Sequence, residues 1–121
     1  MAVRAVRGAT QVPADERAAI MDGTTELVLA VLEANALAPE DLISVLFTAT
    51  PDLTAEFPAL AARKAGLSNV PLLCASEIAV PGALPRVVRL MAHVETELPA
   101  AEVRHVYLHG ATALRPDLER P

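Results

Sequence analysis

Apolar side chains recur at helical spacing through residues 15–35. They lie three and four residues apart, which is the stripe of one long amphipathic helix: Ile20, Met21, Thr24, Leu27, Val28, Val31 and Leu32. Pro13 ends the segment before this stripe. Asp15 is a suitable N-cap, because its carboxylate can accept a hydrogen bond from a free backbone N–H. Gly23 costs about 1 kcal/mol inside a helix relative to Ala, so we expect close packing around it.

Five further segments have the composition and pattern of β-strands: residues 2–10, 43–50, 70–75, 84–96 and 103–108. The second is a continuous apolar run, which predicts a strand buried on both faces. The third contains Pro71 near its beginning, which suits the start of a strand or the edge of a sheet. The fourth alternates apolar and polar residues with period two. We expect a strand there, although its Leu, Met and Ala residues would also tolerate a helix.

Two shorter segments complete the predicted element order. Residues 38–41 form a single helical turn with Pro39 early in it, and residues 57–65 form a short helix or 3₁₀ segment that Gly66 ends. The resulting order predicts an α/β (α+β-like) fold in which a mixed five-stranded sheet carries one long helix, not a doubly wound sheet. One long helix cannot cover both faces of five strands, so an apolar face would stay open. We therefore expect an oligomer with sites at the borders between subunits.

The composition indicates one domain and excludes several classes of partner. Of the 121 residues, 53% are hydrophobic and 2% aromatic, so we expect a single domain over residues 1–121 with a core of Ala, Val, Leu and Ile. A net charge of −5 and few aromatic rings argue against a nucleic-acid partner. No apolar run reaches the length of a membrane span, and the first residues lack a secretion signal. Cys74 is the single cysteine, so we expect a cytoplasmic protein without an internal disulfide.

The chemistry-bearing residues form neither a metal site nor a common catalytic motif. The three His residues lack zinc-ligand spacing, Cys74 has no second thiol, and no glycine-rich phosphate loop or G-x-S-x-G turn is present. We therefore expect no metal and no cofactor. Nine of the ten basic residues are Arg, whose planar guanidinium binds carboxylates through two hydrogen bonds, although GC-rich coding would also explain this excess. Arg4 and Arg7 are three residues apart and would point to opposite faces of a strand.

Four stretches of sequence, taken in order and with their spacing, carry a family resemblance. They are Val6 to Thr10, Ala49 to Leu53 with Phe57-Pro58-Ala59, Val70 to Cys74 with Glu77, and Arg104-His105-Val106-Tyr107-Leu108 followed by Leu114-Arg115-Pro116-Asp117-Leu118. From Arg4 to Leu118 the chain resembles the monofunctional chorismate mutases of the trimeric pseudo-α/β-barrel class. The resemblance implies a homotrimer with active sites in clefts between neighbouring subunits. It also implies that chorismate is rearranged to prephenate without a cofactor, in phenylalanine and tyrosine biosynthesis.

The resemblance further implies roles for nine residues. Arg89 would face the ether oxygen of the substrate, Arg7 would hold a carboxylate, and Glu77 would accept a hydrogen bond from the ring hydroxyl. Tyr107 would donate to a carboxylate, and Phe57 would form an apolar wall. The remaining substrate-binding residues would be Arg63, Leu73, Cys74 and Arg115. Without the resemblance, Arg89 and Glu77 would be interpreted as solvated charges, and Phe57 and Cys74 as core residues.

The C-terminal segment and position 60 complete the expectations. On a straight strand Tyr107 and Arg115 would be about 26 Å apart at about 3.3 Å per residue. We therefore expect residues 111–121 to form a flexible tail that bends at Gly110 and closes over bound substrate. Leu60 stands where some relatives carry a charged residue, so carboxylate contacts must come from the other Arg residues. Two alternatives remain open: an enzyme like the reactive-imine deaminases, similar in architecture only, and a trimeric module that binds an aromatic carboxylate.

Overall fold

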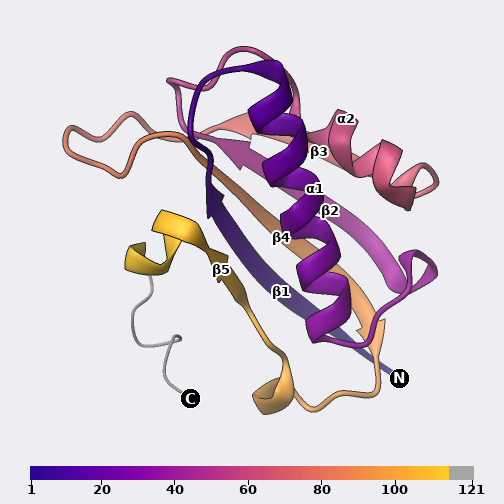
Figure 1. Cartoon of the computed structure of the whole chain (residues 1–121). Helices are drawn as coiled ribbons and strands as arrows, with labels where there is room; N and C mark the ends of the chain where they lie inside the picture. Colours follow the sequence, from indigo (N-terminus) through magenta and orange to yellow (C-terminus); the bar gives the residue numbers. More distant parts are fainter. Residues whose placement is uncertain (115–121) are drawn as a thin grey trace.

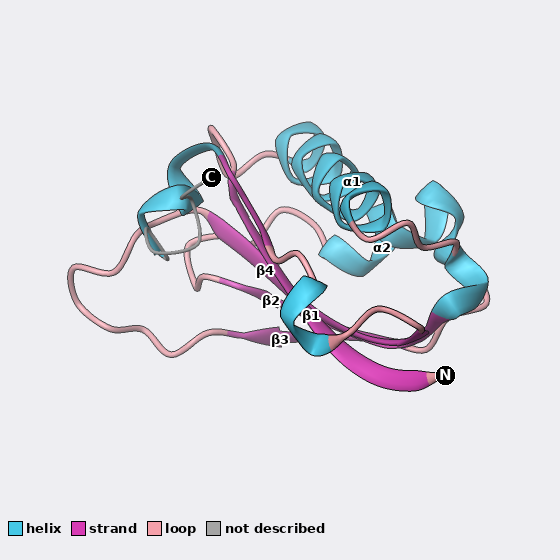
Figure 2. Cartoon of the chain, turned by 90° about the horizontal axis from the view of Figure 1, so that it is seen from below, coloured by secondary structure: helices cyan, strands magenta, loops and turns pink. Residues whose placement is uncertain are grey.

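In the part of the chain that the structure describes, residues 1–114, five strands form a mixed sheet, and helices α1 and α2 lie together on one face (Figures 1 and 2). The structure is a computed structural model. The strand order is β3-β2-β4-β1-β5, in which β4 is antiparallel to both neighbours and the edge strands β3 and β5 are added in parallel. The main elements are β1 (Ala2–Gln11), α1 (Arg17–Ala34), β2 (Leu42–Ala49), α2 (Pro58–Ala62), β3 (Leu72–Ser76), β4 (Val87–Thr96) and β5 (Val106–Leu108).

This architecture confirms the predicted fold class and element order. The alternating segment predicted over residues 84–96 is β4, where apolar side chains are buried and the residues between them are mostly exposed. Pro71 lies directly before the edge strand β3, as expected. Pro39–Asp41 forms the predicted helical turn, η1. After α2 the chain continues through a π-helical turn, η2 (Arg63–Leu67), in which Gly66 takes a φ of +118° that favours glycine.

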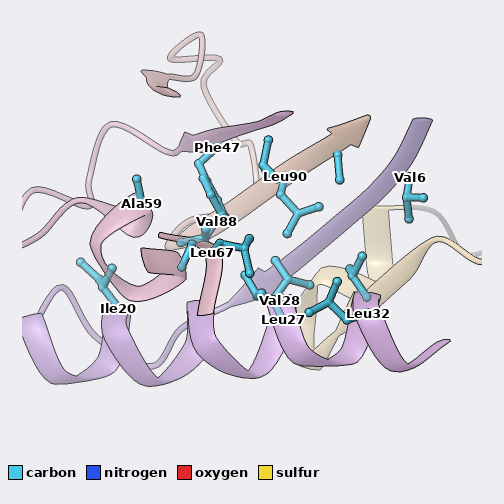
Figure 3. Close-up of a cluster of buried hydrophobic side chains, with 14 of the residues drawn as sticks. Val6, Ile20, Leu27, Val28, Leu32, Phe47, Ala59, Leu67, Val88 and Leu90 are labelled. Carbon is cyan, nitrogen blue, oxygen red and sulfur yellow. The ribbon is translucent and has the colours of Figure 1, made fainter. Parts of the chain in front are cut away.

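The core lies between α1 and the sheet face that α1 covers (Figure 3). All members of the predicted helical stripe except Met21 are buried. They pack with side chains from the three central strands, and Phe47 on β2 is the largest fully buried residue described. The core is therefore almost entirely aliphatic, in agreement with the composition. The other face of the sheet is left without an α-helix in the described residues.

Gly23 is a point of close approach between α1 and the segment that directly follows β1, which confirms the close packing expected there. A Cβ added to Gly23 would lie 2.6 Å from Val12 Cγ1, closer than side chains tolerate. Val12 is only 1% exposed, so it has little room to move.

Gly23→Ala should therefore destabilise the protein, by about 1–3 kcal/mol of unfolding free energy, through overpacking. The intrinsic preference of a helix for Ala, worth about 1 kcal/mol, acts in the opposite direction. Urea unfolding, monitored by circular dichroism, measures the net effect on the free energy of unfolding. Adding Val12→Ala should make the double variant more stable than the sum of the two single changes predicts. A Gly23→Ala protein more stable than wild type would contradict this account.

Two predictions near the helices are wrong. α1 begins at Arg17 with Glu16 as N-cap, and no side chain caps it, because the Asp15 carboxylate binds backbone N–H groups of residues 54–55 instead. The apolar run of residues 43–50 is not buried on both faces: Ile43 and Leu46 on β2 are 41% and 38% exposed. Leu46 is exposed because α1 and α2 both lie on the opposite face (Figure 2), and Ile43 lies at an irregularity in the pairing of β2 with β4, between Leu42 and Ser44.

The last strand is also shorter than predicted. Residues 103–105 do not extend β5, because Val103 directly follows the 3₁₀ turn η3 (Ala100–Glu102). The backbone N–H of Arg104 then donates to the side chain of Asn35, at 2.8 Å, instead of to a neighbouring strand. Pairing with β1 starts only at Val106.

The chain after β5 forms a 3₁₀ helix, η4 (His109–Leu114), on the sheet. Ala111 is fully buried and packs with Ala9 and Val87 in a second, smaller cluster that Tyr107 and Leu114 also contact. The predicted flexibility of residues 111–121 stays a prediction. Arg115 and the rest of that tail lie outside the described residues.

Candidate active site

Three of the predicted site residues share one cavity on the open face of the sheet. Ala9 on β1 lies opposite Arg89 on β4 and beside Tyr107 on β5, so the three side chains project from the same face. Arg7 lies two residues before Ala9 and therefore shares this face. Arg7, Arg89 and Tyr107 line a cavity of about 230 Å³, together with Leu46, Thr48 and Met91. We call this group the cationic half-site.

The alternation of β4 is what brings the Arg89 guanidinium to this cavity. The residues on either side of it, Val88 and Leu90, are buried beneath α1. Arg89 therefore projects away from the core, and its side chain is 44% exposed. This direction agrees with the alternation of apolar and polar residues predicted over residues 84–96.

Glu77 holds the Arg89 side chain from outside this cavity, and the two residues together border a neighbouring cavity of about 330 Å³. Arg89 Nε donates to Glu77 Oε2 at 3.1 Å, and the Thr48 hydroxyl donates to the same oxygen at 2.8 Å. The backbone N–H of Glu77 donates to the carbonyl of Ala49 at 2.9 Å, which fixes the carboxylate just after β3. Because the ion pair uses Nε, it leaves the two terminal guanidinium nitrogens for other partners. A half-exposed pair of this kind adds little stability, so its main effect is to orient the cation.

A second group of predicted residues lines a different cavity. Phe57 and Cys74 border a space of about 420 Å³ between the loop before α2 and strand β3, together with Leu53, Glu56 and Pro58. Cys74 pairs with Phe47, whose side chain is buried on the helix-covered face, so the thiol also projects to that face and away from Arg89. Phe57 is 68% exposed. We call Phe57 and Cys74 the apolar half-site.

The structure does not unite the predicted residues in one place within a single chain. Leu73, which is 65% exposed, and Arg63, on η2, line neither of these two cavities. Arg115 lies outside the described residues. A larger cavity, of about 560 Å³, borders Asn35 and Arg104 and contains none of the predicted site residues.

The loop that carries Phe57 is held by two carboxylates. Asp15 accepts hydrogen bonds from Thr54 and Ala55, and these bonds lower the pKa of its carboxyl group. Glu56 accepts one from the backbone N–H of Phe57 and one from Arg17, which lower the pKa of Glu56 in that order. Both groups are therefore ionised at neutral pH. Their contribution to stability is present above the pKa values of the unfolded chain and is lost as the pH falls through the lowered ones.

Sequence reasoning missed the roles of Thr48 and Asp15. Thr48 lines the cationic half-site and holds Glu77, but in the sequence it is one polar residue inside an apolar run. Its partner is 29 residues away, and no local pattern indicates it. His105 is another case: its Nδ1 accepts the backbone N–H of Arg7 at 2.9 Å and ties β1 to the segment entering β5.

Among residues 1–114, no group of three or more His, Cys, Asp and Glu side chains is arranged to hold a metal ion. Within the same residues, no helix is long and apolar enough to span a membrane.

Comparison with known proteins decides the family. The model of the family "Chorismate mutase type I" matches residues 3–118. The chain belongs to this family. Chorismate mutase AroH of Thermus thermophilus is 53% identical over 118 residues, covering 97% of each chain. Chorismate mutase AroH of Bacillus subtilis is 43% identical over 119 residues, covering 98% of this chain and 94% of the relative.

A solved structure agrees with the family assignment. The chorismate mutase from Clostridium thermocellum superposes with a TM-score of 0.89 and is 43% identical, covering 90% of this chain and 97% of that one. This similarity confirms the resemblance to the monofunctional chorismate mutases and the predicted α/β fold with a mixed five-stranded sheet. It leaves the role of each site residue as a prediction.

Proposed function

We propose that this protein is a chorismate mutase that rearranges chorismate to prephenate in a cleft shared by two subunits of a homotrimer. Membership of the type I chorismate mutase family supports the activity. The observation that carries the mechanism is the cationic half-site, which places two guanidinium groups and a phenol around one cavity. An enzyme like the reactive-imine deaminases, or a carboxylate-binding module, is not favoured by these relatives.

The rearrangement is intramolecular, and it needs no proton transfer and no covalent intermediate. The ether C–O bond breaks while a C–C bond forms, and negative charge develops on the ether oxygen in the transition state. A fixed cation near that oxygen is therefore the group that accelerates the reaction most, because it binds the transition state better than the substrate. Arg89 is the candidate, since Glu77 holds its Nε and leaves the terminal nitrogens to meet the oxygen.

The remaining polar groups of the cationic half-site, and Glu77 next to it, suit the anionic substrate. Arg7 and Tyr107 can hold a carboxylate through charge and a phenolic O–H, respectively. Glu77 has four acceptor directions on its carboxylate and uses those of Oε2 for Arg89 and Thr48. Its other oxygen is the candidate acceptor for the ring hydroxyl.

A cleft between subunits is supported by the division of the site into two halves. The apolar half-site faces away from the cationic half-site within one chain, so a single subunit cannot surround a small ligand with both. Exposed apolar side chains also belong to both half-sites: Leu46 and Met91 line the cationic one, and Phe57 is part of the apolar one. A trimer would cover these side chains and bring one half-site of each subunit to the other half-site of its neighbour. A cytoplasmic location is supported by a free Cys74.

The decisive experiment is a chorismate assay with the purified protein. We expect the absorbance of chorismate to fall in proportion to enzyme concentration, with prephenate as the product detected by chromatography. Addition of a metal chelator should leave the rate unchanged, because no step of the proposed rearrangement uses a metal. Saturable binding of chorismate without turnover would contradict the proposal and support the carboxylate-binding alternative.

A further inference from the structure

We propose that Asp15 is a positioning residue for substrate binding, because its carboxylate holds the loop that orients Phe57. The inference rests on the proposed function, since it takes Phe57 as the apolar wall for the substrate ring. Asp15 lies in the connection between β1 and α1, and it contacts neither of the two half-site cavities. Its effect must therefore act through the residues that it binds.

The loop in question joins β2 to α2 and covers residues 50–57. It has no regular secondary structure, and a segment of this kind is mobile unless specific contacts hold it. Its first half is anchored by Leu53, which is 9% exposed, and by Asp52, whose Oδ2 accepts the backbone N–H of Arg86 at 3.0 Å. The second half, residues 54–57, has mostly exposed side chains and needs another anchor.

Asp15 supplies that anchor through three hydrogen bonds from one carboxylate. The backbone N–H groups of Thr54 and Ala55 donate to Oδ1 at 2.9 Å and 3.0 Å. The Thr54 hydroxyl donates to Oδ2 at 2.9 Å. Two consecutive backbone N–H groups that converge on one oxygen fix the direction of the chain at that point, which a single side-chain contact would not do.

Glu56 fixes the backbone of Phe57 relative to the start of α1. Its Oε2 accepts the backbone N–H of Phe57 at 2.9 Å, and its Oε1 accepts Arg17 Nε on α1 at 2.9 Å. Arg17 follows Asp15 by two residues, so the start of α1 holds the loop at two adjacent points. The positive charges of Arg17 and Lys64 both favour the ionised form of Glu56.

The exposure of Phe57 explains why the backbone has to be held. With 68% of Phe57 exposed, packing within the chain does not fix its ring, so the ring follows the backbone of residues 54–57. A substrate that meets a preorganised wall binds without the cost of ordering it. Loss of the Asp15 contacts should therefore weaken substrate binding and leave the chemistry at Arg89 unchanged.

A double-mutant cycle between Asp15 and Phe57 tests this inference. Asp15→Ala should raise KM about tenfold, because small displacements of a binding group have large effects, while kcat changes less than about twofold. Asp15→Asn should recover most of the wild-type KM, because its amide oxygen can still accept both backbone N–H groups. In the Phe57→Ala background, Asp15→Ala should raise KM no further, since the wall that Asp15 holds is gone. Asp22→Asn, an exposed carboxylate on α1, is the matched control and should leave KM unchanged.

Circular dichroism and thermal melting of each variant show that the protein compared is folded. If Asp15→Ala does not fold, the same cycle with Thr54→Val removes only the hydroxyl bond, and it should raise KM about twofold to threefold while Thr54→Ser does not. An unchanged KM in folded Asp15→Ala, or Asp15 and Phe57 effects that multiply, would overturn the inference while the wild-type enzyme stays active. Absence of chorismate turnover in the wild type would instead overturn the proposed function.

Discussion

Arg89→Ala should lower kcat at least about a hundredfold while the protein stays folded. Negative charge develops on the ether oxygen only in the transition state, so the loss appears in kcat rather than in KM. Removal of one preorganised donor to a developing oxyanion typically costs about 3–4 kcal/mol, or about 10²–10³ in rate. The exposed Arg89 side chain contributes little to the core, so circular dichroism and melting temperature should remain close to those of wild type. Initial rates of chorismate loss give both kinetic constants.

Two further variants test whether the geometry of the Arg89 guanidinium group matters beyond its positive charge. Arg89→Lys should recover only part of kcat, because a single ammonium cannot bind Glu77 through Nε and present two terminal nitrogens to the substrate. Arg4→Ala is the matched control on the neighbouring strand β1. Its Nε donates to the Leu98 carbonyl at 3.0 Å, away from the cavity, so its effect on kcat should be small. Near-normal kcat in folded Arg89→Ala would contradict the assigned mechanism.

The sequence predicted the sheet and the direction of Arg89 because both depend on local periodicity. An alternating strand has one buried face, so once Val88 and Leu90 are assigned to the core, Arg89 must project the other way. The same reasoning placed Arg4 and Arg7 on opposite faces of β1. The long helix was equally predictable, because its apolar stripe forms one buried surface. These predictions need no knowledge of which strands are neighbours.

The predictions that failed depend on contacts between distant segments. Asp15 has the residue type and position of an N-cap, but its partners are 39 and 40 residues away, and sequence spacing does not reveal them. The apolar run in β2 was expected to be covered on both faces, yet the helices described lie on one face only. In the single chain, Leu46 therefore lines the cationic half-site and does not belong to a second core.

The division of the site into two halves also follows from the pairing of the strands rather than from the local pattern of the sequence. Cys74 and Glu77 are three residues apart, which predicts that they belong to one segment of one site. Parallel pairing with β2 places Cys74 beside Phe47, on the helix-covered face. Glu77 lies beyond the end of β3 and reaches Arg89 on the opposite side. Residues adjacent in the sequence thus serve different cavities, and a resemblance alone does not tell which subunit contributes which residue.

Two variants that are each nearly inactive should regain activity when they are mixed. Arg89→Ala disables the cationic half-site, and Phe57→Asp disables the apolar half-site by placing a carboxylate against an anionic substrate. In a trimer with shared clefts, a cleft works when one subunit supplies an intact Arg89 and its neighbour an intact Phe57. After equal amounts are unfolded together and refolded, random assembly should make about a quarter of the clefts intact. Activity should therefore rise more than about tenfold above that of either parent treated in the same way.

The reciprocal mixture provides the control for this experiment. When wild type is refolded with an equal amount of the Arg89→Ala/Phe57→Asp double variant, about a quarter of all clefts in the mixture should be intact if clefts are shared, but about half if each lies within one subunit. Light scattering should give about three times the 12.7 kDa chain mass for wild type and for both mixtures. Refolded wild type sets the full activity against which these fractions are measured. If the two single variants show only the sum of their own activities in a mixed trimer, the two half-sites do not meet across a subunit boundary.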